Sequence, residues 1–524
     1  IIFDKLRIES ESEVGLKSAS DKVYACKGLK KEDETSDFTS FYLDEIENVQ
    51  KNYKNNENLI KYTTSLLAGN QKKIMIDSDV CSMKKWLEVD RFPMGKYPSK
   101  FSPTLMQQIA INIAISEKDR KEKIFSVNGP PGTGKTTLLK EIIASNVVQL
   151  AEVLIKYGIS GSNFVPRKVE STSNARYTEK YYEIPEEISK YGILVVSNNN
   201  GAVENVTLDL PKSGDMGKDK TRTDYFDRKI NKEVYFSAVA DNLLGKEGGA
   251  WGLISARMGR KSYVTEVLES CVFAKKNDAS DKVTLDLARE DSISWDEAID
   301  KFNVAKRKVL LLREGIKKDQ KLLDDFYKEG EGLAKSKLDL KQLLIEKEQL
   351  NIKLNDVRTE LESNEQETLE QEGEIKYIKE HSSIFKKLLI LLGIGKIGRH
   401  VAEKQKYVDE LIINHEDIKR RYSLAVRNTE EVCGKIENQY SIISTLEKKV
   451  QILEEKIYGN NGSLKNKYKN NFADRNFYEA IKESENSQNA CPWTFDEYDM
   501  AREELFFASL QVRKAFILES PYIK

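Results

Sequence analysis

The sequence predicts an α/β protein, in which a parallel sheet is interrupted by a long antiparallel coiled-coil hairpin and preceded by an N-terminal accessory region. Two stretches predict the sheet. Residues 123–140 pass from a β-branched run through a glycine-rich loop into an apolar helical start, and residues 192–197 carry a second continuous apolar run. Apolar residues at heptad spacing between positions 343 and 457 predict the hairpin.

The glycine-rich loop reads GPPGTGKTT over residues 129–137 and matches every position of the phosphate-loop pattern. Its glycines let successive backbone N–H groups face one anion, and the following helix adds its positive N-terminal end. A glycine- and proline-rich turn that binds no ligand is the alternative, but the strand–loop–helix context favours binding of ATP or GTP. Lys135 would reach the β- and γ-phosphates, and Thr136 would complete a Mg²⁺ shell, which makes them the catalytic candidates. The predicted nucleotide-binding residues are Gly129, Pro130, Pro131, Gly132, Thr133, Gly134, Lys135, Thr136 and Thr137.

A helix is predicted just upstream, over residues 102–115. Gln107 or Gln108 would face outward there, and a glutamine amide can pair with the edge of an adenine. Most helical glutamines are merely solvated, so this signal is weak alone. After the second apolar run, the polar turn NNNGAVENV leads into another helix, and ligands of parallel sheets bind beyond such strand ends.

Three segments together, GPPGTGKT, the upstream LMQQIA and the downstream VVSNNNGAVENV, resemble the first motor half of superfamily 1 helicases. The closest branch includes the nonsense-mediated-decay helicases. The resemblance covers residues 100–210, and residues 235–259 more loosely. It implies a P-loop (RecA-like) sheet, ATP as the nucleotide and Gln107 as the residue that reads adenine.

The same resemblance implies that the polar turn after the second strand contacts the backbone of DNA or RNA. The family's segment maps onto residues 199–204, with Asn199, Asn200 and Gly201 as the nucleic-acid-binding candidates and Glu204 in place of the usual Asp. A helix N-cap is the alternative reading of the asparagine run, because asparagine is common at that position.

The hairpin is predicted from two helical arms around a central break. The first starts at residue 294 and pauses at Gly330 and Gly332, and each arm of about 50–58 residues would reach about 75–85 Å. The first arm has heptad residues Leu343, Leu350, Leu354, Val357 and Leu361. In the second arm, one heptad lattice contains Leu411, Ile418, Ala425, Val432, Leu446 and Leu453, and its companion contains Tyr422, Ile436, Ile443, Val450 and Ile457.

The hairpin tip, residues 382–399, combines an apolar cluster with lysines and an arginine. It either packs on itself as a folded apex or serves a protein partner, self-association or a membrane surface. Among the three, a protein partner is favoured.

Composition changes divide the chain into four parts: an accessory region (1–98), a first RecA-like motor domain (99–290), the hairpin (291–460) and a helical return to the motor domain (461–524). Ile1 in place of Met indicates a piece of a longer protein. The net charge of −1 neither predicts nor excludes nucleic acid.

Some chemistries are disfavoured by the composition. Five dispersed cysteines without a CxxC pair indicate reduced thiols in a cytoplasmic protein and no zinc site. The three histidines all belong to the predicted hairpin, which disfavours histidine catalysis. The sequence has neither a signal peptide nor an apolar run that could span a bilayer.

Hydrolysis needs carboxylates that hold magnesium and orient water, and helicases supply them as Asp-Glu (Walker B) at the end of a buried strand. The pairs Asp296-Glu297 and Asp496-Glu497 lack such a strand, and no arginine finger is evident. We therefore expect these parts to follow Lys524 and the chain by itself to be inactive.

The leading hypothesis is an ATP-dependent nucleic-acid translocase or helicase whose hairpin engages a partner or nucleic acid. An SMC-like ATPase also has a coiled coil between its nucleotide motifs, but it lacks GPPGTGKT and LMQQIA. An AAA+ remodeller would carry its acidic pair after the second strand. A nucleotide-gated coiled-coil scaffold is the remaining alternative. Lys-, Asn- and Ile-rich usage is typical of AT-rich bacterial genomes, where such motors serve repair, RNA turnover and phage defence.

Overall fold

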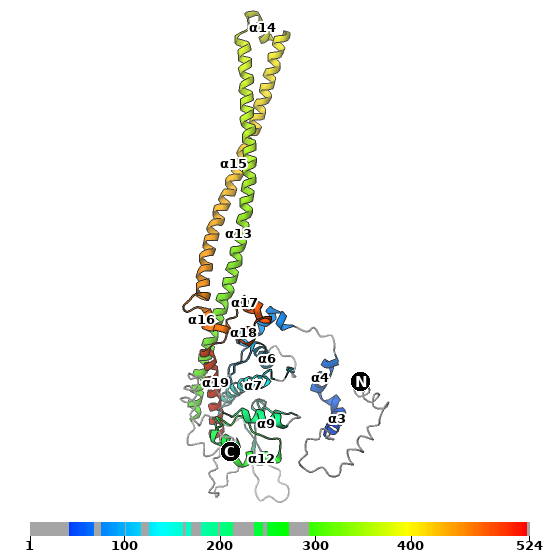
Figure 1. The fold of residues 1–524 in the computed structure, drawn as a ribbon, viewed down its shortest axis with the longest axis vertical. Helices are drawn as coiled ribbons and strands as arrows, with labels where there is room; N and C mark the ends of the chain where they lie inside the picture. Colours follow the sequence, from blue (N-terminus) through cyan, green and yellow to red (C-terminus); the bar gives the residue numbers. More distant parts are fainter. Residues whose placement is uncertain are drawn as a thin grey trace, which may run out of the picture. The chain divides into compact units, whose positions relative to one another are not determined.

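The described part of the chain is almost entirely helical (Figure 1). The computed structural model describes residues 41–67, 75–99, 101–116, 125–130, 132–160, 164–168, 180–197, 200–212, 235–244, 249–271 and 293–520. They belong to two compact units. The first comprises residues 1–74 with 121–126, and the second comprises residues 75–120 with 127–524.

The first unit contains two helices, α3 (Phe41–Asn52) and α4 (Glu57–Leu67), joined by the 3-10 turn Tyr53–Asn55. The Tyr53 hydroxyl is 2.7 Å from the Thr63 hydroxyl, which ties the turn to α4. The accessory region expected over residues 1–98 is divided, because residues 75–99 belong to the second unit. Met83, Leu87 and Val89 are buried in that unit's core.

The second unit is built around α19 (Asp496–Glu519), which packs against α7 (Lys135–Tyr157) and α13 (Trp295–Glu380). α19 is buried on most sides, and its buried side chains include charged ones such as Arg502 and Glu503. Four of its large apolar side chains are fully or nearly fully buried: Leu505, Phe506, Leu510 and Phe516. The C-terminal helix is therefore a central element of this unit.

The other helices of the second unit are shorter. Their bounds are α5 (Val80–Trp86), α6 (Leu105–Ile115), α8 (Glu186–Ser189), α9 (Asn200–Asp209), α11 (Ser237–Leu244), α12 (Lys261–Cys271), α16 (Leu464–Tyr468), α17 (Arg475–Glu479) and α18 (Glu485–Asn489). Within the described residues, no helix is long and apolar enough to cross a membrane.

The predicted parallel, RecA-like sheet is wrong for the residues that the structure describes. Their only strands, β1 (Val165–Lys168) and β2 (Lys180–Glu183), form one antiparallel pair with Val165 opposite Glu183. Residues 125–130 and 192–197 form no strand. Leu194 and Val196 are 80% and 82% exposed, so the second apolar run is not a buried strand.

The physical reason lies in what an apolar run specifies. β-branched residues favour an extended backbone, but a strand exists only where a neighbouring segment supplies ladder hydrogen bonds. That neighbour is distant in the sequence, and the run itself carries no information about it. The error therefore lies in the assumed pairing of these segments.

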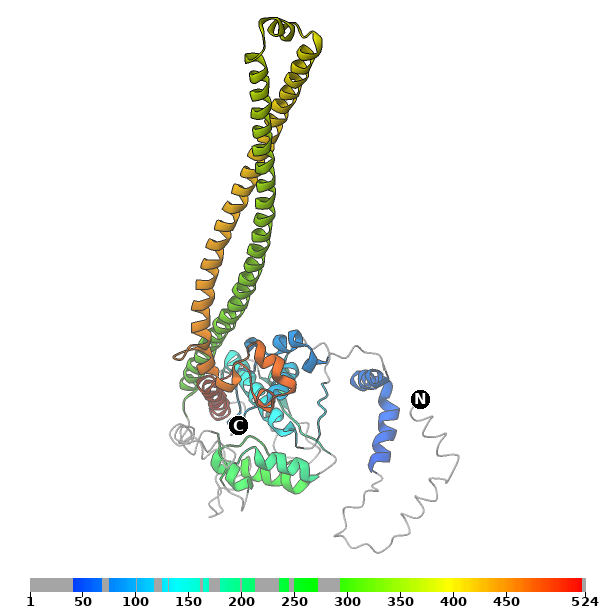
Figure 2. The ribbon, with the colours of Figure 1, turned by 45° about the horizontal axis from the view of Figure 1, so that its top comes forward.

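The hairpin is formed by α13 and α15 (Gly395–Tyr458), with the short helix α14 (Ile384–Leu392) across its far end (Figures 1 and 2). The expected pause at Gly330 and Gly332 is wrong, because α13 runs through both. Glycine weakens a helix by about 1 kcal/mol relative to alanine, which long paired helices absorb. The 64 residues of α15 span about 96 Å at the helical rise, more than the expected length.

Heptad packing holds the two arms together. The most buried side chains of α15 along its length are Val401, Val408, Leu411, Ile418, Val432, Ile436, Ile443 and Ile457. Ion pairs cross the seam, among them Lys337 with Glu447 at 2.8 Å. The base of α13 is part of the core of the second unit, since Phe302, Val309 and Ile316 are buried there.

Candidate nucleotide site

The first turn of α6 fixes the side chain of Gln107. Thr104 is the N-cap residue, and its backbone N–H donates to Oε1 of Gln107 at 2.9 Å, as in a capping box. Leu105 and Ile109 anchor the helix in the core. The helix thus begins three residues after the predicted start at residue 102, and its cap holds the glutamine amide at the helix end.

Gln107 also reaches the glycine-rich loop, residues 129–137. Its Nε2 donates to the backbone oxygen of Thr133 at 2.7 Å. Gly134 lies beside it in the left-handed region with φ 72°. A Cβ at Gly134 would come within 2.3 Å of Gln107 Nε2, and the positive φ favours glycine at this point. The structure therefore brings together two motifs that lie far apart in the sequence.

The amide of Gln107 retains part of its hydrogen-bonding capacity. A glutamine has two N–H donors and a carbonyl oxygen with two lone pairs, and the hydrogen bonds with Thr104 and Thr133 use one of each. One donor and one acceptor remain, which is the pair that an adenine edge requires at N7 and N6. The side chain is half-buried, so it is accessible to a ligand.

Gln108, the other candidate glutamine, has a structural role. Its side chain is buried, and its Nε2 donates to Oδ1 of Asn112 at 2.7 Å. Asn112 in turn donates to the backbone oxygen of Trp86 at 2.7 Å. This buried chain of hydrogen bonds joins α6 to α5, so geometry separates the two glutamines where sequence could not.

Lys135 lies over the loop at the first turn of α7. Its Nζ donates to the backbone oxygens of Gly129 at 2.7 Å and Pro130 at 2.8 Å. Thr133 Oγ1 donates to the Pro130 oxygen at 2.8 Å, and Gly132 has φ 83°. These contacts curl the backbone back toward the helix N-terminus.

Other residues of the loop differ in exposure. Thr136 is exposed and Thr137 is half-buried, and the N–H of Thr137 donates to the Gly134 oxygen at 3.0 Å. Pro131 lies outside the described residues. A loop that carries an exposed lysine and threonine at a helix N-terminus fits a polyphosphate with Mg²⁺. Among the residues that the structure describes, no group of three or more His, Cys, Asp or Glu side chains is arranged to hold a metal.

A cluster of buried charged residues, which the sequence analysis does not predict, lies where α7 meets α19. Its members are Lys96, Glu141, Asp499, Arg502 and Glu503. Lys96 Nζ is 3.2 Å from carboxylate oxygens of both Asp499 and Glu503. Arg502 lies 3.6 Å from Glu141 and 3.5 Å from Asp499. Three carboxylates therefore face two cations where α7 meets α19.

Glu141 carries the main electrostatic cost of this cluster. Burial raises the pKa of its carboxyl to about 7, although Arg502 and Lys96 act in the opposite direction. Its 3.6 Å separation from Arg502 is longer than a hydrogen bond. Glu141 lies less than two turns after Lys135 on the same helix, so this charge sits directly behind the loop.

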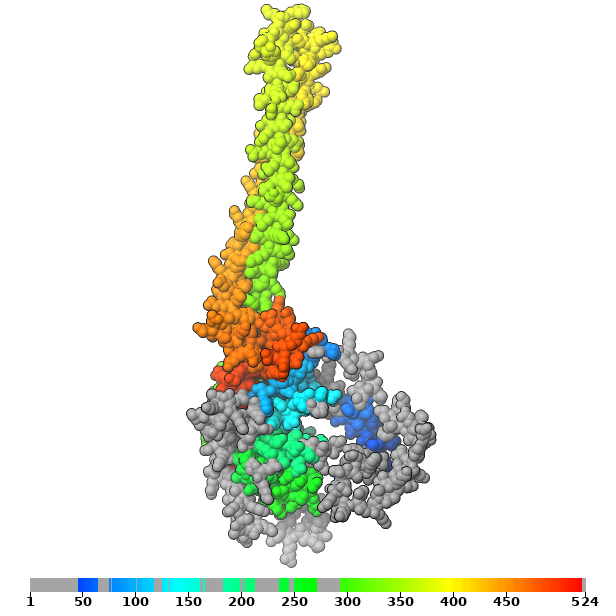
Figure 3. All heavy atoms as spheres, in the orientation of Figure 1, coloured from blue at the N-terminus to red at the C-terminus, as the bar shows by residue number. Residues whose placement is uncertain are grey.

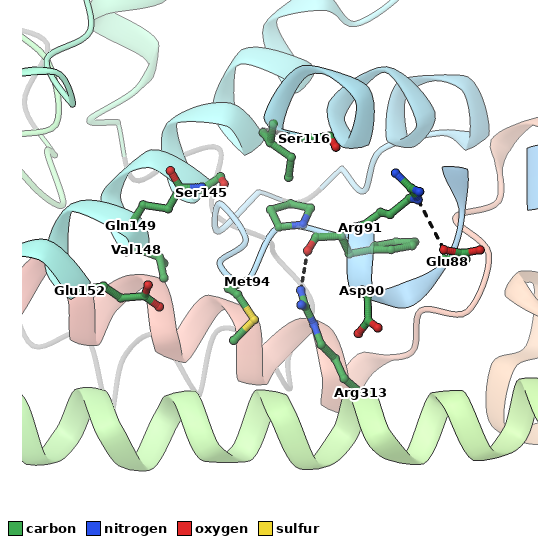
Figure 4. A pocket seen from close by; sticks show the side chains of 13 residues that line it. Glu88, Asp90, Arg91, Met94, Ser116, Ser145, Val148, Gln149, Glu152 and Arg313 are labelled. Carbon is green, nitrogen blue, oxygen red and sulfur yellow. Dashed lines mark hydrogen bonds and ion pairs between the residues drawn. The ribbon is translucent and has the colours of Figure 1, made fainter. Parts of the chain in front are cut away.

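The base of the hairpin contacts the same region through Arg313 of α13. Its guanidinium donates to the Tyr498 hydroxyl at 3.1 Å and to the backbone oxygen of Phe92. Figure 4 shows Arg313 rising from α13 into a pocket of about 490 Å³, with Gln149 and Glu152 of α7 on the opposite side. The glycine-rich loop does not line this pocket. The residues that line the pocket include several of α7 and Arg313 at the base of the hairpin.

The predicted nucleic-acid-binding residues are only partly described. Asn199 lies outside the described residues, Asn200 begins α9, and Gly201 is exposed in its first turn. A helix that begins at the asparagine run agrees with the alternative reading of this run. Glu204 pairs with Arg257 at 2.9 Å, which ties α9 to the segment before α12.

Both acidic pairs that the sequence analysis discounted lie in first turns of helices. Asp296 and Glu297 follow the N-cap Ser294 at the start of α13, and Asp496 and Glu497 begin α19. Carboxylates at these positions interact favourably with the helix dipole, which accounts for them without catalysis.

No family model matches the chain, and no curated protein or solved structure matches it either. The assignment of the site therefore depends on the chain's own residues, above all on the contact between Gln107 and the loop.

Proposed function

We propose that this chain is the nucleotide-binding part of an ATP-dependent nucleic-acid translocase or helicase related to superfamily 1. The observation that carries the proposal is the 2.7 Å hydrogen bond between Gln107 and the backbone of Thr133. It joins an adenine-reading group to a phosphate-binding loop in one site. An idle glycine turn gives no reason for this contact.

Each residue has a distinct role in this proposal. Gln107 presents its remaining N–H and lone pair to adenine. When the nucleotide binds, the Lys135 ammonium leaves the backbone oxygens of the loop and donates to β- and γ-phosphate oxygens instead. Backbone N–H groups between Gly132 and Thr137 hold the rest of the phosphate chain. Mg²⁺, when bound with the nucleotide, supplies charge neutralisation, and the Thr136 hydroxyl is its proposed ligand from this chain.

DNA or RNA is the proposed macromolecular partner, bound beside the turn that contains Asn199, Asn200 and Gly201. No described residue is assigned to activation of the attacking water. The activity proposed for this chain is therefore ATP binding.

A nucleotide-gated scaffold is a second candidate, and one observation favours it. The central helix α19 packs against both α7, which begins at the loop, and α13, which becomes the hairpin. A change at the loop would thus reach the hairpin base through one helix. A full-length protein whose ATP turnover no DNA or RNA stimulates would support the scaffold over the translocase.

Lys135→Ala tests the site. We expect ATP affinity to fall at least tenfold, because the ammonium is the main side-chain cation at the phosphates. Binding is measured by calorimetry or with a fluorescent ATP analogue. Lys156→Ala is the matched control, since Lys156 is an exposed lysine near the end of the same helix. Unchanged ATP affinity in Lys135→Ala would overturn the assignment.

A further inference from the structure

Helix α14 lies across the far end of the hairpin, between the end of α13 and the start of α15 (Figures 1 and 2). It is anchored there by Ile390, which packs against the apolar cluster of Ile375, Val401 and Val408. Gly393 ends α14 with φ 67°, and the chain then turns directly into α15. The axis of α14 is thus held across the hairpin, and one side of it faces away from the two arms.

That outward side is apolar. Its residues follow the spacing i, i+1, i+4, i+7 and i+8, which places them on one helix face, opposite Ile390. The exposed fractions are 90% for Ile384, 70% for Phe385, 54% for Leu388, 82% for Leu391 and 58% for Leu392. These are among the most exposed large apolar side chains of the described residues. The tip therefore does not pack on itself as a closed apex.

The charge around this face has one sign. Between Glu380 and Glu403 the sequence contains no acidic residue, whereas it contains Lys386, Lys387, Lys396 and Arg399. All four basic residues are exposed. The arms next to the tip carry both signs, so the basic bias is confined to the tip.

We propose that the hairpin tip, residues 382–399, binds the surface of an anionic lipid bilayer, with the apolar face of α14 inserted among the headgroups. An interfacial helix lies parallel to the bilayer plane, with apolar residues below and basic residues at the headgroups. α14 meets that geometry when the hairpin approaches end-on. With 9 residues, α14 is far too short to span the membrane.

A second copy of this chain and a protein partner fit the tip less well than a bilayer does. In a tip-to-tip contact between two copies, four positive charges on each side would face one another at close range. A protein partner would need a groove deep enough to receive side chains that project from a narrow convex end (Figure 3). A fluid bilayer needs no such groove, because lipids rearrange around the inserted side chains.

Flotation of the full chain with vesicles tests the proposal. The probes are vesicles of phosphatidylcholine alone and of phosphatidylcholine mixed with phosphatidylglycerol. We expect binding to the anionic vesicles only, weakened at high salt. The double variant Phe385→Ser with Leu391→Ser should bind at least tenfold more weakly, and so should Lys386→Gln with Lys387→Gln.

Matched controls come from exposed apolar residues elsewhere on the same two arms. Leu369 and Ile413 are 69% and 72% exposed, and Leu369→Ser with Ile413→Ser should bind as the wild type does. Because all substituted side chains are exposed, circular dichroism should show the same helicity in every variant. A tip variant that binds as strongly as the wild type would overturn the proposal.

A fluorescent reporter locates the contact. Phe385→Trp keeps the tip apolar, and its emission should shift to shorter wavelength when anionic vesicles are added, whereas that of Leu369→Trp should not. If the wild type ignores anionic vesicles and instead dimerises in a tip-dependent manner, a second copy is the occupant and the lipid proposal is wrong. These outcomes do not depend on ATP binding, so they leave the proposed function untouched.

Discussion

Gln107 joins the start of α6 to the glycine-rich loop with one side chain. Its carbonyl oxygen caps α6 through Thr104, and its amide nitrogen holds the loop through Thr133. Because both partners are backbone groups, the contacts fix the amide plane without depending on another side chain. Gly134 lies directly beside this amide, and its positive φ favours glycine.

Gln107→Ala should reduce the preference for ATP over GTP more than it reduces triphosphate binding in general. The proposed bidentate contact to adenine would be worth about 1–3 kcal/mol of discrimination, which corresponds to roughly a 5- to 150-fold change in the affinity ratio. Competition between ATP and GTP for a fluorescent analogue measures this ratio. An equal loss for both nucleotides would instead assign Gln107 to the loop structure alone. A thermal melt controls for the lost helix cap.

At the scale of elements, α7 and α19 meet over charges rather than over apolar residues alone. Glu141 of α7 faces Arg502 and Asp499 of α19, and Lys96 completes the contact from an irregular segment. Removing either cation of this network would leave buried carboxylates uncompensated, so the elements are tightly coupled. Helix α19 also packs against α13, which continues this coupling to the hairpin base.

Glu141→Gln should change the pH dependence of stability. The folded pKa of about 7 exceeds the ordinary value of 4.5, so between these two values the folded state holds a proton that the unfolded state has lost. The wild type therefore loses stability as pH rises through this window, by up to about 3 kcal/mol in free energy of unfolding. The variant has no carboxyl at position 141, so its free energy of unfolding lacks this decrease with rising pH.

Urea unfolding at about pH 5 and about pH 8 checks this prediction. The two proteins should be similar in acid, and the variant should be more stable in base. Glu497→Gln is the control, because Glu497 is exposed on the same α19. A variant that is less stable than the wild type at the higher pH would mean that the pairing with Arg502 outweighs the burial of the charge.

At the scale of the second unit, the hairpin has two parts with different roles. Its base belongs to the core through Val309, Ile316 and Ile457. Gln439 of α15 donates a hydrogen bond to the backbone oxygen of Ser336 in α13 at 3.0 Å. From this contact toward the tip, the two arms contact mainly each other. The distal part should therefore be removable, whereas the base should not.

Replacing residues 341–437 by a short glycine–serine turn should leave ATP affinity and the core intact. The same change should abolish binding to anionic vesicles, because the tip is lost. The shortened hairpin keeps the contacts between the arms that lie nearest the core, including the ion pair of Lys449 with Glu329 at 3.8 Å. Calorimetry with ATP and vesicle flotation measure the two effects. An unfolded product would contradict the division of the hairpin into base and distal arm.

Much of the helical architecture could be predicted because its signals are local. Heptad spacing predicts the two arms, and the residues from Ser102 on predict a helix that α6 forms from Leu105. The signals at Gly330 and Gly332 misled, because a helix supported by a partner tolerates glycine. The candidate site was predicted as two separate motifs, and their contact was inferred only through a family resemblance.

The sequence by itself determined the helical periods, the glycines of the loop and the one-signed charge of the tip, because each depends on residues a few positions apart. Tertiary structure alone decided that the apolar run at residues 192–197 is not a buried strand, and that Lys96, Glu141 and Arg502 share one buried cluster. Both outcomes depend on which distant segments become neighbours. That choice is made by the free energy of the whole packed unit, and no short stretch of sequence carries it.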